Sequence, residues 1–305
     1  MTTRVYAPPG SDARRAFVGA SEIPALLGVS PYASAYTVWH RIVRGGDGAE
    51  SIAIDIGHAL EPVIRAHAAR ALGVEIAEQP EAYVVGRLGA NLDGLTSDNR
   101  VVECKAWSSR DDDAARSVSL RPDDIEPGKA LCVWWQMQAQ MAACGASGAV
   151  LAALCDKTLV LAHVAADAYA QQIIRAHVEA FWRDHVATGI APDARTCDVE
   201  TLRRTPVSDT AIDLPDLSDL LAERHRLRAE AASLSERAEA IDATVRQRLG
   251  EACSATAGEW RIKRSLVTSS RLDTTRLRAE QPQIADTYTT TTTSDRLTIS
   301  NRSAR

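Results

Sequence analysis

The residue types with the clearest chemical meaning are an acid and a lysine that alternate within an apolar stretch. Residues 101–106 have the sequence VVECKA, so Glu103 and Lys105 are two positions apart. Because side chains alternate along a strand, both would point to one face and their apolar neighbours to the other. Asp93 lies shortly before, within the sequence NLDG at 91–94, and a turn would fold it back beside Glu103. The pattern predicts two carboxylates and an ammonium group at one sheet face.

Such a group of side chains suits phosphodiester hydrolysis. Two neighbouring carboxylates repel each other and favour a cation between them, and oxygen ligands suit Mg²⁺. A lysine beside them can orient or deprotonate a water molecule, or neutralise charge on a phosphate. The alternative is a solvated Glu–Lys pair on an exposed strand. Only four of the 35 basic residues are lysines, and this scarcity favours a chemical role for Lys105.

The hydrophobic pattern predicts the elements that must position these residues. We expect helices over 51–72, 129–144 and 167–188 and strands over 74–77, 83–85, 88–92, 100–106, 149–154 and 159–164. Ser21 and Ser34 are typical N-caps and predict two further short helices. This alternation indicates an α/β domain over residues 1–205, with a mixed central sheet flanked by helices.

The last third of the chain has a different pattern. Leu220, Leu227, Leu234 and Ile241 recur every seven residues. This spacing predicts an amphipathic, coiled-coil-like helical arm over 206–250, which either pairs with a second chain or packs on its own domain. Residues 251–305 would form a small C-terminal α/β unit.

A basic patch lies in the predicted C-terminal unit. It consists of Arg261, Lys263, Arg264 and Arg271. The patch either contacts phosphates or forms a solvated hairpin face.

Composition excludes several classes of protein. The 305 residues are 45% apolar and carry a net charge of −5, which argues against a purely electrostatic DNA binder. No apolar run is long enough to span a membrane and no secretory leader opens the chain, so we expect a cytoplasmic protein. The six cysteines form no C-x-x-C pair, and we expect reduced thiols. The chain lacks a nucleotide-hydrolase phosphate loop.

Five motifs in a fixed order resemble those of the YqaJ-type viral recombinase and lambda exonuclease nucleases of the PD-(D/E)XK superfamily. They are GASEI with LGVSPY (19–23 and 27–32), GHALEP (57–62), NLDG (91–94), ECK (103–105) and QMQAQM (136–141). The resemblance covers residues 14–192 and implies a restriction-endonuclease-like nuclease core. It also implies roles for individual residues.

By this resemblance, Asp93 and Glu103 bind the metal together with the backbone carbonyl of Cys104. Lys105 acts on the attacking water, and Gln136 helps to hold the lysine or the water. Glu61 approaches a second metal or its water shell. Ser21 and an arginine about seven residues before it contact a terminal phosphate in the family. Arg14 fits that spacing, and Arg15 is its neighbour.

The resemblance implies an Mg²⁺-dependent deoxyribonuclease in which Mn²⁺ substitutes for Mg²⁺. We expect a 5′-to-3′ exonuclease acting on double-stranded DNA ends in phage or prophage recombination, within the host cytoplasm if phage-encoded. Its expected partners are a single-strand annealing protein and further copies of the chain. One alternative is a phage-type endonuclease that uses the same site. Another is a non-catalytic DNA-binding or assembly protein that retains the nuclease fold.

Overall fold

The computed structural model describes residues 2–8, 11–45, 52–205, 207–292 and 295–299. The chain divides into two units, Met1–Thr205 and Pro206–Arg305, which are described separately below. Among the described helices, none is both long enough and apolar enough to cross a membrane.

The first unit is built on a mixed sheet. Its strands in the described residues are β1 (Thr3–Val5), β2 (Val18–Gly19), β3 (Ile76–Val85), β4 (Leu88–Thr96), β5 (Arg100–Trp107), β6 (Gly148–Cys155) and β7 (Thr158–Ala165). The order is β1-β3-β4-β5-β6-β7, and β2 pairs with β4. The β5–β6 and β2–β4 pairs are parallel and the other pairs antiparallel. The predicted α/β class with a mixed central sheet is confirmed.

One strand prediction was wrong. The sequence predicted separate strands at 74–77 and 83–85, whereas β3 is continuous from Ile76 to Val85. Its pairing with β4 shifts register between Ala77 and Tyr83, and Pro80 lies in this stretch. Because proline has no N–H to donate, it interrupts the ladder and the apolar alternation there.

Helices cover both faces of this sheet. They are α1 (Ile23–Leu26), α2 (Ala35–Trp39), α3 (Ile52–Leu72), α4 (Asp112–Ser117), α5 (Lys129–Cys144), α6 (Ala168–Phe181) and α7 (Val199–Arg203). The predicted helices over 129–144 and 167–188 are confirmed, the latter ending in a π-helical turn, Trp182–Val186. The helix predicted from residue 51 is α3, which continues through Pro62; residue 51 itself lies outside the described part.

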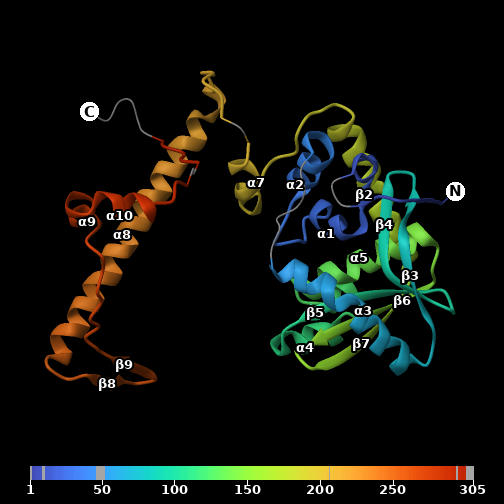
Figure 1. Ribbon diagram of the computed structural model, residues 1–305, viewed down its shortest axis with the longest axis horizontal. Coiled ribbons are helices and arrows are strands. Elements are labelled where there is room, and N and C mark those ends of the chain that lie inside the picture. The colour runs from blue at the N-terminus through green and yellow to red at the C-terminus, as the bar shows by residue number, and fades with distance from the viewer. Residues whose placement is uncertain (1, 9–10, 46–51, 206, 293–294, 300–305) are drawn as a thin grey trace. The chain divides into compact units, whose positions relative to one another are not determined.

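The two longest of these helices, α3 and α5, lie on opposite faces of the sheet (Figure 1). Val102 of β5 belongs to the apolar cluster with Ile64 of α3. Its neighbour Val101 belongs to the larger cluster with Met137 of α5. Because adjacent residues of a strand face opposite ways, β5 forms the middle layer between the two helices. Its side chains therefore reach both.

The second unit is organised around one long helix. It contains α8 (Ser218–Leu249), a hairpin of β8 (Ser254–Ala257) and β9 (Trp260–Lys263), and the short helices α9 (Thr274–Glu280) and α10 (Pro282–Thr287). No residue of α8 is buried, and its heptad residues from Leu220 to Ile241 remain at least half exposed. Pairing with a second chain and packing on its own domain both stay predictions.

A buried acid ties the end of the first unit back to its beginning. The Asp198 carboxylate accepts hydrogen bonds from the Ser34 hydroxyl at 2.6 Å, the Thr37 hydroxyl and the Arg195 N–H. Ser34 also caps α2 as predicted, because its Oγ accepts the N–H of Tyr36. Burial raises the pKa of Asp198. The hydrogen bonds from Ser34, Thr37 and the Arg195 N–H together lower it by more than burial raises it, so the pKa of Asp198 lies below its ordinary value.

We expect Asp198→Asn to lower the free energy of unfolding at pH 7 by about 1–3 kcal/mol, because a hydrogen-bonded buried carboxylate is lost. A carboxyl group whose pKa falls on folding stabilises the native state above its unfolded pKa of about 3.9, and this contribution is lost as pH falls through the folded pKa. The difference between wild type and variant in urea unfolding should therefore shrink below about pH 4. Asp193→Asn, at an exposed position, is the matched control. Equal stability of Asp198→Asn and wild type at pH 7 would contradict this role.

Candidate active site

The site begins where the ladder between β4 and β5 opens. The two strands pair at Leu95–Val101 and Gly94–Val102. Beyond this point the Asp93 side chain replaces the backbone acceptor, because its Oδ2 accepts the Cys104 N–H at 2.7 Å. The predicted strand ended at residue 92, just before Asp93, whereas β4 continues to Thr96 and Asp93 lies inside it. Asp93 and the segment around Glu103 are thereby held together.

Gly94 serves packing and not the turn. A Cβ at this position would lie 2.5 Å from Cγ2 of Ile76, so a larger residue would push β4 away from its neighbour. The chain reverses later, at 97–99, where Asn99 has a left-handed φ of 63°. The glycine therefore allows the close approach of strands beside Asp93.

Glu103 is the most enclosed acid of this site. It is 1% exposed, and its Oε1 lies 2.6 Å from the Lys105 ammonium. Gln136 donates to the same oxygen at 2.6 Å and Gln140 donates to Oε2 at 2.6 Å. The two glutamines are one helical turn apart on α5, so they present their amides to the same carboxylate. A buried charge needs such compensation.

The carboxylates and the lysine influence one another. Burial and then the Glu103 charge raise the pKa of Asp93 to about 8. Burial also raises the pKa of Glu61, with a further increase from Glu103. Burial lowers the pKa of Lys105, but the Glu103 carboxylate more than offsets this and its pKa is raised. The structure thus brings Glu61, Asp93, Glu103 and Lys105 into one electrostatic group.

A divalent cation fits the chemistry of this group. Asp93 and Glu103 supply oxygen ligands, which Mg²⁺ prefers. Burial and the Glu103 charge raise the pKa of Asp93, and a cation beside it would favour its ionised form. In the described residues, however, no three His, Cys, Asp or Glu side chains gather into a metal cluster. The Cys104 side chain packs in the cluster with Ile64 and Ala68, so a ligand from Cys104 would be its backbone carbonyl; that role stays a prediction.

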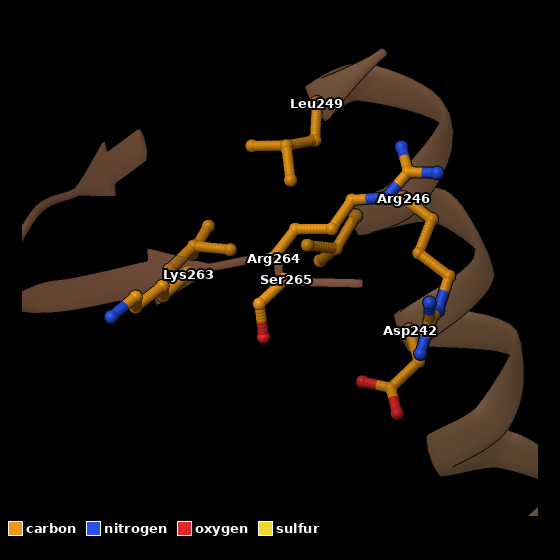
Figure 2. A pocket seen from close by; sticks show the side chains of 8 residues that line it. Asp242, Arg246, Leu249, Lys263, Arg264 and Ser265 are labelled. Atoms are coloured by element: carbon orange, nitrogen blue, oxygen red, sulfur yellow. The ribbon is translucent and has the colours of Figure 1, made fainter. Parts of the chain in front are cut away.

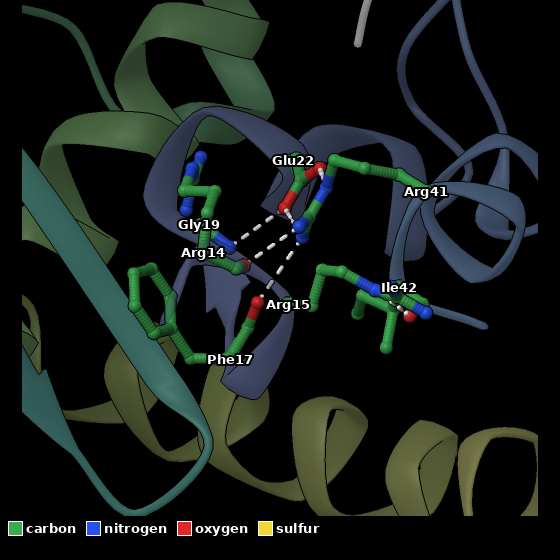
Figure 3. A network of polar contacts seen from close by, with 7 residues as sticks. All are labelled: Arg14, Arg15, Phe17, Gly19, Glu22, Arg41 and Ile42. Atoms are coloured by element: carbon green, nitrogen blue, oxygen red, sulfur yellow. Dashed lines mark hydrogen bonds and ion pairs between the residues drawn. The ribbon is translucent and has the colours of Figure 1, made fainter. Parts of the chain in front are cut away.

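Two of the three predicted phosphate residues, Arg14 and Arg15, lie in a second polar network (Figure 3). The Arg14 guanidinium lies 5.0 Å from the Phe17 ring centroid. A Cβ at Gly19 would lie 2.3 Å from its NH2, so a larger residue at 19 would displace the guanidinium. The NH1 of Arg14 is buried without a hydrogen-bond partner in the described residues. Arg14 therefore retains an unused donor.

Arg15 is held differently. Its Nε and NH2 donate to the carbonyls of Ile42 and Val43, both at 2.9 Å. Two of its three guanidinium nitrogens consequently donate to the backbone of the π-helical turn after α2, whereas the NH1 of Arg14 has no hydrogen-bond partner among the residues that the structure describes.

Ser21 lines a cavity of about 230 Å³ that also contains Glu22, Cys132 and Gln136. It does not cap a helix, contrary to the sequence prediction. It lies within a 3₁₀ turn, Ala20–Glu22, where Glu22 Oε2 accepts the Gly19 N–H at 2.7 Å. The acid three residues after Gly19 takes over the capping role. Ser21 nevertheless shares its cavity with Gln136, which binds Glu103.

Sequence reasoning missed three residues. Gln140 binds Glu103 as closely as Gln136 does, and its i, i+4 spacing from Gln136 was the available signal. Glu22 and Arg41 were also missed. Arg41 grips the Glu22 carboxylate through Nε and NH2 and donates to the carbonyls of Arg14 and Phe17 (Figure 3). No local pattern pairs residues 19 positions apart.

Comparison with known proteins agrees with the motifs. Residues 11–147 match the model of the YqaJ-like viral recombinase domain, so the predicted family resemblance is confirmed for this part of the chain. No curated protein matches the sequence.

Among solved structures, an alkaline exonuclease from Laribacter hongkongensis is 21% identical, with a TM-score of 0.48, covering 58% of this chain and 91% of the other. The same exonuclease in complex with dAMP gives a TM-score of 0.49 at 21% identity, with the same coverage. A phage-related exonuclease from Haemophilus somnus is 13% identical, with a TM-score of 0.44, covering 57% of this chain and 96% of the other.

We expect Gln140→Met to lower the rate of DNA cleavage by about 10–100-fold, because the loss of a group that orients a functional side chain typically has an effect of this size. The substitution keeps most of the buried volume and removes the amide that fixes Glu103 Oε2. Gln138→Met is the matched control. Gln138 is as buried, but it bonds the backbone of Ala165 and Asp167. Its variant should lose thermal stability and keep its turnover; an unchanged rate in Gln140→Met would contradict the positioning role.

Proposed function

Because residues 11–147 match the model of the YqaJ-like viral recombinase domain, we propose that this chain is an Mg²⁺-dependent deoxyribonuclease. The observation that carries the proposal is the group of Asp93, Glu103 and Lys105, with Glu103 fixed by two glutamines of α5. A protein that only binds DNA does not need a buried, oriented carboxylate beside an ammonium group.

The residues have separate tasks in this proposal. Asp93 and Glu103 would hold the cation together with the Cys104 carbonyl, and Glu61 would approach its water shell. When bound, Mg²⁺ supplies an activated water and offsets charge on the leaving oxygen. Lys105, 2.6 Å from Glu103, orients the attacking water and neutralises charge that develops on the phosphate. Gln136 and Gln140 prevent Glu103 from turning away. Mn²⁺ would replace Mg²⁺ with the same ligands.

We further propose that the enzyme degrades double-stranded DNA from 5′-phosphorylated ends. Arg14 has an unused buried NH1 donor, and a terminal phosphate carries more charge and more exposed oxygens than an internal diester. Ser21 lines the cavity that reaches Gln136, and Gln136 contacts Glu103. A bound 5′ end would therefore lie near the catalytic group.

This activity suits phage or prophage recombination. Removal of one strand from a duplex end leaves a single strand, which a single-strand annealing protein would receive. An endonuclease using the same site is the competing activity, and it would cut closed circular DNA. A non-catalytic assembly protein would bind DNA without cutting it.

Lys105→Ala should abolish cleavage, at least a 100-fold loss, while the protein stays folded and binds duplex DNA. The physical reason is that Lys105 acts on the water and the phosphate, whereas Gln136 and Gln140 continue to donate to the buried Glu103 carboxylate in the variant. Lys129→Ala is the matched control, because Lys129 forms a partly exposed ion pair with Asp111. Digestion of labelled duplex with Mg²⁺ measures the effect. Normal turnover in Lys105→Ala would contradict the mechanism, and absence of cleavage in wild type would favour the non-catalytic alternative.

Wild type should digest 5′-phosphorylated duplex at least ten times faster than 5′-hydroxyl duplex. Charge-assisted hydrogen bonds contribute about 1.5–3 kcal/mol each, enough for this preference. Arg14→Ala and Ser21→Ala should reduce the preference through the 5′-phosphoryl rate alone. Arg15→Ala should change it less, because Arg15 binds the backbone of 42–43. Equal rates on both ends, or efficient nicking of closed circles, would support the endonuclease alternative.

A further inference from the structure

We propose that the second unit binds single-stranded DNA in a groove between the end of α8 and strand β9. The groove has a volume of about 310 Å³ and is lined by Asp242, Val245, Arg246, Leu249, Ile262, Lys263, Arg264 and Ser265. Figure 2 shows Arg246 on the helix and Arg264, which follows β9, directed toward each other, whereas the Lys263 side chain extends away from the helix. The ligand chemistry that fits such a lining is a chain of phosphates.

The charge of the groove is not compensated locally. Of its charged lining residues, Arg246, Lys263 and Arg264 are basic and Asp242 alone is acidic. In the described part of the chain, the side chains of Arg246 and Lys263 have no hydrogen bond or ion pair, and Arg264 uses NH1 on the Gly250 carbonyl.

The surrounding segment has the same sign. Residues 242–271 contain six basic and three acidic residues, whereas the whole chain has a net charge of −5. Concentrated positive charge in an acidic protein requires a cause, and neutralisation of phosphates supplies one.

An exposed aromatic ring adds a second, independent feature. Trp260 begins β9 and is 72% exposed, so it contributes little to the core of its own unit. Because side chains alternate along a strand, Trp260 shares a face with Ile262, which lines the groove. Arg264, two residues beyond Ile262, and Arg246 of α8 line the same groove, whereas Arg261 points to the opposite face of β9. An aromatic ring beside basic side chains is the arrangement on which unpaired bases stack while the backbone is neutralised.

Single-stranded DNA fits this surface better than a duplex does. Stacking on Trp260 requires a base whose face is free, and bases inside a duplex already stack on their neighbours. The choice of DNA as the nucleic acid rests on the proposed function, because the proposed nuclease leaves a single strand. The groove and its charge are independent of that function. The second unit would thus retain the strand that the nuclease leaves behind.

Binding of the full-length chain to a fluorescent oligothymidine, in the presence of a chelator that prevents cleavage, tests this inference. In Arg246→Ala/Lys263→Ala, the slope of log K against log salt concentration should fall by about 1.4, since each single-strand phosphate contact contributes about 0.7. Trp260→Ala should weaken binding about tenfold and leave the slope unchanged.

Arg226→Ala and Arg276→Ala are matched controls in the same unit. Each arginine is already paired with a glutamate, Glu223 or Glu280, and both variants should bind as wild type does. Wild-type affinity and slope in the groove variants would overturn the inference, and so would an equal loss of affinity for duplex and single strand. Duplex digestion with Mg²⁺, measured on the same variants, is the separate test of the nuclease. Loss of oligothymidine binding without any hydrolysis in wild type would count against the nuclease proposal alone.

Discussion

The burial of the Glu103 charge is the constraint on which the first unit depends. A carboxylate that is 1% exposed loses its hydration, and the protein must replace those hydrogen bonds. Lys105 supplies one donor from the same strand, and Gln136 and Gln140 supply two from α5. Helix α5 must therefore lie across β5 in one rotation and one axial position. The functional carboxylate thus also fixes the packing of the layers.

The order of elements along the chain also favours the position of α5 over β5. Strands β5 and β6 are parallel neighbours, so the chain must cross over one face of the sheet between them, and α5 lies in that crossover. Strand β5 and the helix that holds the Glu103 carboxylate consequently belong to one continuous segment of the chain. Asp93 comes from the other side, through the opening of the β4–β5 ladder. The site is assembled from β5, from the neighbouring strand β4 and from α5 on one face of the sheet.

The sequence was sufficient for the parts of the structure that local periodicity controls. Alternation placed Glu103 and Lys105 together, and the apolar spacing of 129–144 gave the bounds of α5. The β4–β5 register and the merging of two predicted strands into β3 depend on pairing partners and on Pro80, which periodicity does not describe. Asp198 and Arg41 each bond to residues far along the chain. Their side chains carry no local signal, because only tertiary folding brings the partners within reach.

The absence of a side chain at Gly19 has a consequence for which residues related sequences can carry at positions 14 and 19. The Arg14 guanidinium occupies the volume that any other residue would need. A larger residue at 19 therefore requires that the Arg14 guanidinium moves or that position 14 loses its arginine, whereas a smaller residue at 14 conflicts with nothing at Gly19. Related sequences should show this asymmetry: glycine should be enriched at position 19 where position 14 is arginine, whereas glycine at 19 does not imply arginine at 14.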